Sequence, residues 1–170
     1  NIMLEPNKRI AKYMINHDKS FKDVIKWSGY KFAEDIIKAT DNYYYYRQQL
    51  GVSYDTTLVG VFGTWNRESL FHILGEELFH FAQSLRSKGY QFIFSIHPKE
   101  YMVYNMQIRP MGPLVEAQRE KGFIVRSPSE DWLPYLIASD IIICDYSSMY
   151  ELAIIAEKKI ILSDFPANKV

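Results

Sequence analysis

Short apolar runs alternate with longer amphipathic runs from residue 57 to the end of the chain. The longer runs repeat their apolar positions every three or four residues, as helices do. Strands and helices that alternate at this spacing predict right-handed β-α-β units and an α/β fold with a doubly wound parallel sheet. The predicted strands are Leu58 to Phe62, Gln91 to Ile96, Gly122 to Arg126, Ile141 to Cys144 and Lys159 to Leu162. The predicted helices are about Glu68 to Ser87, Leu114 to Glu120, Asp131 to Ser139 and Met149 to Glu157.

The first 50 residues show a helical pattern that is interrupted. Ser20 with Asp23 indicates a helix start, and Gly29 breaks the run that follows. A last helix carries the consecutive tyrosines 43–46 and stops at Gly51. We therefore predict a helical lead-in over residues 1–50 and a second unit over residues 51–170. The tyrosines either contact another surface or add to the core of their own domain.

Length and charge exclude several classes of protein. The 170 residues suffice for one domain with a substantial core. Because 20 basic residues balance 20 acidic ones, the chain lacks the uniform positive field of non-specific nucleic-acid binders. The single cysteine, Cys144, excludes an internal disulfide and fits a reducing compartment. No apolar run approaches the roughly 20 residues that cross a bilayer, so membrane contact is expected to be peripheral.

The segment from Asp140 to Glu151 predicts a strand, a tight turn and the start of a helix. Backbone N–H groups and the positive end of the helix dipole meet at such a junction, which favours a bound phosphate. We expect the amides of residues 147–149 and the hydroxyls of Ser147 and Ser148 to contribute. The alternative is a capping box, in which Ser148 and Glu151 only satisfy the helix backbone.

A parallel sheet brings the ends of distant strands to one edge. Thr64, His97, Ser127 and the serine pair each follow a predicted strand, so we expect them to share that edge, where α/β proteins bind ligands. His97 precedes Pro98, which ends the strand, and it can donate to a phosphoryl oxygen or balance its charge when protonated. The alternative for His97 is a solvated loop histidine.

Charged residues near this edge have two interpretations each. Asp145 would repel a phosphate, so it either orients His97, a cation or a hydroxyl, or is a structural acid at the strand end. Glu151 is placed to accept from a ribose diol. Arg67, Lys99 and Arg126 either balance a diphosphate or are solvated.

A second histidine pattern points to metal binding. His72, Glu76 and His80 recur at one-turn spacing on one helix face, opposite the leucines. A solvated polar face explains the same pattern, and we favour it over a metal site. The sequence contains no G-x-G-x-x-G, P-loop or G-x-S-x-G motif, which argues against dinucleotide oxidoreductases, P-loop hydrolases and serine hydrolases.

Three motifs together resemble the CDP-glycerol glycerophosphotransferase family of teichoic acid polymerases and primases. They are Thr64-Trp65, the segment Ile96 to Lys99, and the segment Ala138 to Ser148, and the similarity covers roughly Leu58 to Pro166. The resemblance implies a Rossmann-like, nucleotide-binding C-terminal half of a GT-B enzyme, with the lead-in belonging to an N-terminal half that binds the acceptor. Two departures leave the donor open: Asn66 separates Arg67 from Trp65, and Lys159 stands where proline is common.

The resemblance also implies an activity, namely transfer of glycerol phosphate from CDP-glycerol to an acceptor hydroxyl with release of CMP. It places the catalytic histidine at His97, the serine pair at Ser147 and Ser148, and the ribose-binding acid at Glu151. It implies a peripheral protein at the cytoplasmic face of the membrane and a lipid-linked or polymer acceptor held by the other half. No cofactor is implied, and a divalent metal is left open. All candidate donor-binding residues are Thr64, Arg67, Lys99, Arg126, Ser127, Asp145, Ser147, Ser148, Met149 and Glu151.

Other functions compete with this one. A general base is expected from the other half, so the chain alone is expected to bind nucleotide weakly and to transfer nothing. A GT-B glycosyltransferase half with another nucleotide-sugar donor fits the same pattern. A receiver-like signalling module would need paired acids after the first strand, and Gly63-Thr64-Trp65 supplies none. A non-catalytic domain that uses its tyrosines to hold a partner remains an alternative.

Overall fold

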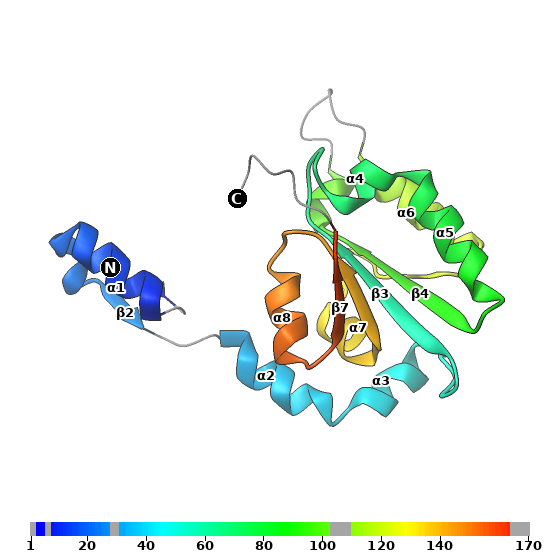
Figure 1. Ribbon diagram of the computed structural model, residues 1–170, viewed down its shortest axis with the longest axis horizontal. Helices are drawn as coiled ribbons and strands as arrows, with labels where there is room; N and C mark the ends of the chain where they lie inside the picture. The colour runs from blue at the N-terminus through cyan, green and yellow to red at the C-terminus, as the bar shows by residue number, and fades with distance from the viewer. Residues whose placement is uncertain (1–2, 6–7, 28–30, 103–109, 164–170) are drawn as a thin grey trace.

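The computed structural model describes residues 3–5, 8–27, 31–102 and 110–163. Its centre is a five-stranded parallel sheet of order β5-β4-β3-β6-β7 (Figure 1). The predicted fold class, a Rossmann-like parallel sheet of the kind found in one half of a GT-B enzyme, is confirmed. The strands are β3 (Thr57–Gly63), β4 (Tyr90–Ile96), β5 (Ile124–Val125), β6 (Ile141–Cys144) and β7 (Lys159–Leu162).

Helices cover both faces of this sheet (Figure 1). One core is formed by alternate residues of β3 and β4 with α4 (Leu70–Leu74), α5 (Glu76–Arg86) and α6 (Gly112–Glu120). The other core is formed by the opposite face with α7 (Leu133–Ala138) and α8 (Met149–Ile155). Burial on both faces explains why the residues of the central strands β3 and β4 are apolar almost throughout rather than alternating.

The central strand fits its neighbours closely at Gly60. A β-carbon added there would lie 2.5 Å from the Ser139 hydroxyl and 2.7 Å from the Phe62 ring. Ser139 is itself fixed, since its hydroxyl donates to the Tyr135 carbonyl of α7 at 2.7 Å. Only glycine therefore lets α7 and the turn before β6 pack this tightly on β3.

The single helix predicted from Glu68 to Ser87 is wrong in one respect. The helix is divided into α4 and α5 at Gly75. The φ of Gly75 is +51°, which is incompatible with a continuous right-handed helix. Ser69 begins α4 by accepting from the His72 amide. Leu74, the last residue of α4, is 36% exposed, although the leucine spacing of a continuous helix would place it on the buried face.

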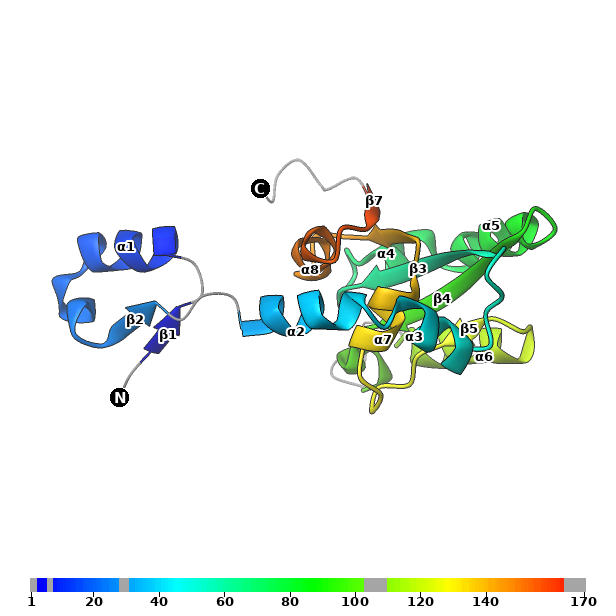
Figure 2. The same ribbon diagram turned by 90° about the horizontal axis from the view of Figure 1, so that it is seen from below.

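The lead-in is not helical throughout, which corrects the sequence prediction. Residues 3–27 form a small unit in which β1 (Met3–Glu5) pairs in parallel with β2 (Ile25–Trp27), beside α1 (Lys8–His17). Figure 2 shows these elements gathered around one another. Where Ser20 predicted a helix start, a short 3-10 turn, η1 (Lys19–Lys22), begins at Asp18 instead, because the Asp18 carboxylate accepts from the Ser20 amide at 2.8 Å. Gly29 lies outside the described residues.

Two further helices precede the sheet, α2 (Lys31–Thr40) and α3 (Tyr43–Gln49), and they pack on the helices α7 and α8 that cover it. Ile36 and Ala39 are buried in the same core as Leu136 and Leu152. Tyr43 and Tyr46 pack against this core, as one of the two interpretations expects, whereas Tyr44 and Tyr45 are exposed. Contact of the exposed tyrosines with another surface stays a prediction. The predicted domain boundary at residue 50 stays a prediction, but the packing continues across it.

A polar cluster fixes α3 to the amino edge of the sheet. The Arg47 side chain, 2% exposed, donates to Asp140 at 2.9 Å and to the carbonyls of Ser53, Thr56 and Ala138. The Asp140 carboxylate also accepts from the Tyr43 hydroxyl at 2.5 Å and from the Leu58 amide at 2.7 Å. Asp140 thus joins α3, β3 and the start of β6.

This cluster predicts acid sensitivity. Burial by itself would raise the pKa of Asp140, but hydrogen bonds from Tyr43 and the Leu58 amide, with the Arg47 charge, outweigh it and lower that pKa. A carboxylate whose pKa is depressed by folding contributes stability that is present above its unfolded pKa, about 3.9, and is lost as pH falls through the folded pKa. We expect Asp140→Asn to flatten the loss of stability below about pH 4 in urea unfolding. Asp41→Asn, at an exposed position, is the control. If the free energy of unfolding fell equally with decreasing pH in both variants, Asp140 would not be the source of the acid sensitivity.

No helix among the described residues is long and apolar enough to cross a membrane.

Candidate functional site

The strand order reverses between β3 and β6. The chain moves outward from β3 to β4 and β5 and then returns to the other side of β3. Gly63 lies opposite Ile96 and Phe62 opposite Cys144, so the residues that follow these strands emerge at the same edge. A pocket of about 290 Å³ opens there, lined by Phe62, Gly63, Ser95, Ile96, His97, Pro98, Arg126, Pro128, Glu130, Trp132 and Met149. The shared edge predicted from the sequence is therefore present.

His97 is half-buried and lines this pocket directly after β4. Its Nδ1 accepts from the Lys99 amide at 3.1 Å, which leaves the ring proton on Nε2. Burial of the ring, followed by the charge of Lys99, lowers the pKa of His97. Of the two roles considered for it, the structure therefore favours a neutral N–H donor over an imidazolium cation.

Lys99 and Trp65 stand beside this histidine. The Lys99 ammonium lies 3.9 Å from the centre of the Trp65 ring, and the Trp65 and His97 rings are 6.4 Å apart. Trp65 is 42% exposed, so the positive charge is held over an aromatic surface that solvent reaches. Lys99 is thus close enough to His97 for its charge to lower the pKa of the ring, although Lys99 does not itself line the pocket.

Asp145 is buried and structural, which corrects the prediction that it contacts a ligand. Its two carboxylate oxygens accept from the amides of Thr64 at 2.9 and 3.0 Å, Leu70 at 3.1 Å and Ser147 at 3.2 Å. Among the described residues, it forms no hydrogen bond or ion pair with His97 or with a cationic side chain. Asp145 therefore ties the loop after β3 to the turn after β6.

The turn after β6 carries unsatisfied polar groups beside the pocket, although Ser147 and Ser148 are not among the residues that line it. Met149 lines the pocket, and no hydrogen bond joins the Ser148 or Met149 amide to another described residue. The Ser147 hydroxyl oxygen is buried without a partner among the described residues. Ser148 precedes α8, but its side chain caps no amide there, so the predicted capping box with Glu151 is absent. These groups are the ones that the phosphate interpretation requires.

Arg126 lines the pocket, yet most of its donors are already used. Its guanidinium donates to the Ser95 hydroxyl at 2.7 Å and to the carbonyls of Ile96, Ser127 and Glu130. Burial lowers its pKa. Arg126 therefore holds β4, β5 and the next loop together, and what it offers a ligand is chiefly its charge.

The other candidates lie at the margin. Thr64 follows β3, and its amide is held by Asp145. The Ser127 amide donates to Glu130 at 2.6 Å, and its hydroxyl lies 3.4 Å from Arg119. Arg67 and Glu151 are exposed, and Glu151 accepts from the Tyr150 hydroxyl at 3.1 Å. None of these four lines the pocket.

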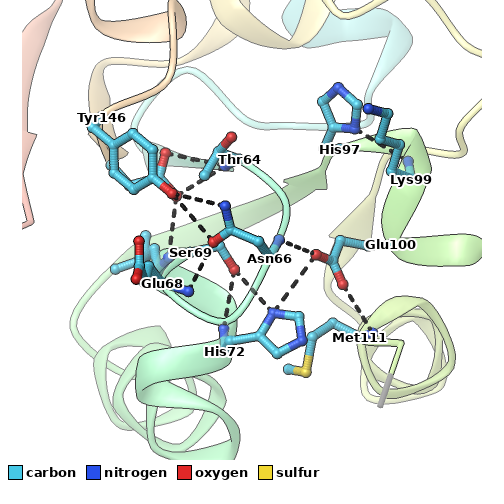
Figure 3. A network of polar contacts seen from close by, with 12 residues as sticks. Thr64, Asn66, Glu68, Ser69, His72, His97, Lys99, Glu100, Met111 and Tyr146 are labelled. Atoms are coloured by element: carbon cyan, nitrogen blue, oxygen red, sulfur yellow. Dashed lines mark hydrogen bonds and ion pairs between the residues drawn. The ribbon is translucent and has the colours of Figure 1, made fainter. Parts of the chain in front are cut away.

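A buried network beneath this edge was not predicted from the sequence (Figure 3). Glu100, 5% exposed, accepts from the Asn66 amide at 2.9 Å and the Met111 amide at 3.3 Å, and lies 3.6 Å from the His72 ring. Asn66, at a φ of +100°, also exchanges hydrogen bonds with the Tyr146 hydroxyl at 3.1 and 3.2 Å. The network fixes the loops after β3, β4 and β6 to one another. The sequence gives one hint of this network: Pro98, directly after His97, is typical of the first residue of a helix, and the short helix η2 (Pro98–Tyr101) that it begins carries Glu100.

The histidine pattern does not form a metal site. His72 belongs to α4 and points to Glu100, whereas Glu76 and His80 belong to α5 beyond the break at Gly75. The described residues contain no group of three or more histidine, cysteine or acidic side chains that could hold a metal. His72 is also half-buried, so the favoured solvated face is wrong for that residue.

Comparison with known proteins gives a fold but no sequence relative. No family model and no curated protein matches the chain. A variant of the wall teichoic acid polymerase TagF, soaked with CDPG, matches with a TM-score of 0.66 over 99% of this chain at 16% identity. TagF without that soak matches with a TM-score of 0.63 over 94% of this chain at 14% identity. The chain shares its fold with the wall teichoic acid polymerase TagF.

The predicted resemblance is thereby confirmed at the level of the fold. The chain spans about two-fifths of the TagF chain, covering 39% and 38% of the two solved examples. A UDP-N-acetylglucosamine 2-epimerase from Rickettsia bellii has a similar fold, with a TM-score of 0.54 over 94% of this chain and 41% of the epimerase at 16% identity. The likeness to TagF therefore covers the sheet and both layers of helices.

Proposed function

We propose that this chain is the donor-binding half of a CDP-glycerol:glycerophosphate glycerophosphotransferase. The supporting observation is the pocket at the strand-order reversal, which His97 and Met149 both line. Met149 belongs to the turn that carries the Ser147 hydroxyl and the Ser148 and Met149 amides, which bond to no other described residue. Groups that donate without carrying charge suit a diphosphate, whose oxygens accept several bonds at once. The fold shared with TagF and the motif resemblance supply the substrate class.

The reaction would be a displacement at phosphorus. The oxygen of an acceptor hydroxyl forms a bond to the phosphorus that bears glycerol, and the bond from this phosphorus to the oxygen bridging it to the CMP phosphate breaks. CMP leaves with the bond's electron pair, and the hydroxyl proton passes to a base in the acceptor-binding half. Negative charge grows on the leaving phosphate, so donors that are already in place lower the barrier. His97 and the serine pair would supply them here.

Binding is tested on this chain by NMR chemical-shift titration. CDP-glycerol should shift the resonances of residues 147–151 and His97. His97→Ala and Ser147→Ala should each weaken binding roughly 10- to 100-fold, because a hydrogen bond to a charged group is worth about 1.5–3 kcal/mol. His80→Ala and Ser129→Ala change exposed residues of the same types and should leave the affinity unaltered.

Two results would redirect the proposal. Tighter binding of UDP-N-acetylglucosamine than of CDP-glycerol would favour the alternative of a nucleotide-sugar glycosyltransferase half. If no nucleotide, including CMP, shifts residues 147–151, a non-catalytic interaction domain is favoured. Tyr44, Tyr45 and Tyr54, which are 59%, 57% and 76% exposed, would then be its candidate contact surface.

A further inference from the structure

A second cavity lies on the face of the sheet covered by α5 and α6. Its volume is about 230 Å³, and it is lined by Phe79, His80, Gln83, Gln118, Lys121 and Phe123. None of these residues lines the pocket at the carboxyl edge. Gln118 stands near the end of α6, and Phe123 comes just before β5, so the cavity lies toward the amino ends of the strands.

Gln118 carries a hydrogen-bond acceptor that the protein does not satisfy. The residue is 2% exposed, its Nε2 donates to the Leu114 carbonyl at 2.9 Å, and its Oε1 has no partner among the described residues. Exchanging the amide's oxygen and nitrogen would set two acceptors against each other at Leu114, so the assignment is fixed by that contact. A buried acceptor left without a donor is destabilising.

Several donors around the end of α6 are engaged by other acceptors. The amides of Lys121 and Phe123 both donate to the Gln118 carbonyl, at 3.1 and 3.2 Å. The Arg86 guanidinium donates to the carbonyls of Lys121 and Gly122 and lies 5.1 Å from the centre of the Phe123 ring. None of the donors of the described residues bonds to Oε1, the side chains of His80, Gln83 and Lys121 at the same cavity included, so the acceptor is left for the donor of a ligand.

The walls determine the rest of the chemistry. Phe79 and Phe123 are 3% and 4% exposed and present apolar surface, while His80, Gln83 and Lys121 are exposed and form the rim. The volume is below the roughly 300–1,000 Å³ of sites for drug-sized ligands, and it suits a single ring. Gln118 itself lines the cavity, so a ligand there lies beside its side-chain amide.

We propose that this cavity binds a small one-ring molecule that carries a hydrogen-bond donor. The ring packs against Phe79 and Phe123, and its O–H or N–H donates to Gln118 Oε1. The site lies outside the donor pocket, and its existence does not depend on the proposed transfer reaction.

Phenol and benzene test this site, because they differ by the donor alone. In an NMR titration of the whole chain, phenol should bind at least about 10-fold more tightly and should shift the Gln118 side-chain amide, as one hydrogen bond of about 1.4 kcal/mol requires. Water solvates phenol better than benzene, so an apolar cavity alone would prefer benzene. Gln118→Met, which keeps the volume and removes the acceptor, should bring the ratio to about 1 or below, whereas Gln83→Met at the rim should keep it.

Two outcomes would overturn the proposal. One is equal or weaker binding of phenol in the unaltered chain, and the other is no shift at Gln118 with either compound, which would mean that Oε1 is served by water only. If Gln118→Met does not fold, the comparison in the unaltered chain and in Gln83→Met still decides. No nucleotide enters the experiment, so its failure is distinct from failure of the proposed transfer function.

Discussion

Replacing Arg47 with methionine is expected to lower the free energy of unfolding by about 3–5 kcal/mol. Methionine fills similar space but leaves the Asp140 carboxylate without its cation and the carbonyls of Ser53, Thr56 and Ala138 without a donor. The free energy of unfolding of a natural domain is only about 5–15 kcal/mol in total. The melting temperature should therefore fall by roughly 6–20 °C, and urea unfolding followed by circular dichroism measures the change.

A matched control separates burial from charge. Arg119→Met removes an arginine that is about half exposed and pairs with Glu116 at 3.2 Å within one helix. Such surface pairs contribute roughly 0.2–1 kcal/mol, so this variant should stay near the unaltered protein. If both variants lost the same stability, the special position of Arg47 at the amino edge would be refuted.

Asp145→Asn is expected to lower the free energy of unfolding by about 2–4 kcal/mol, although the two side chains have nearly the same volume. Oδ1 accepts from Thr64 and Ser147, and Oδ2 accepts from Thr64 and Leu70. Either orientation of an asparagine amide therefore sets its NH₂ group against a backbone N–H. Urea unfolding gives the loss of stability. The same variant should weaken binding of CDP-glycerol, because the turn at residue 147 loses its tie to the loop after β3.

Asp131→Asn is the control for this substitution. Asp131 is exposed, and one of its oxygens accepts from the Leu133 amide at 3.1 Å, a bond that the asparagine oxygen can replace. We expect a change within about 0.5 kcal/mol. A mild effect of Asp145→Asn, comparable to that of Asp131→Asn, would show that the carboxylate is not what holds the two loops together.

Local pattern was sufficient for most of the sheet, because each strand is apolar on both faces and bounded by turn residues. Ile141 to Cys144 and Lys159 to Leu162 match β6 and β7 residue for residue. The pattern failed where one residue overrides periodicity. Gly75 divides a helix whose leucine spacing continues across the break, and the pairing of β1 with β2 depends on contacts between residues 20 or more positions apart.

The position of the candidate site was predictable, because the common direction of the strands determines which residues meet at one edge of the sheet. His97, Arg126 and Met149 line one pocket because every strand of the sheet is parallel. The structural roles of Asp145 and Arg126 were not predictable, because the sequence around an acidic or basic residue at a strand end does not reveal whether it binds a ligand or backbone groups. Glu100 and Asn66 were missed for the same reason, because their partners are distant in sequence.

The position of Arg47 has a practical bearing on how this unit can be excised. A version trimmed to begin at Gly51, as the pattern of strands would invite, discards the guanidinium that closes the amino edge and the two helices that cover Leu136 and Leu152. The newly bared apolar surface would invite aggregation. The smallest fragment that keeps α2 and α3 packed over α7 and α8 starts at or before residue 31.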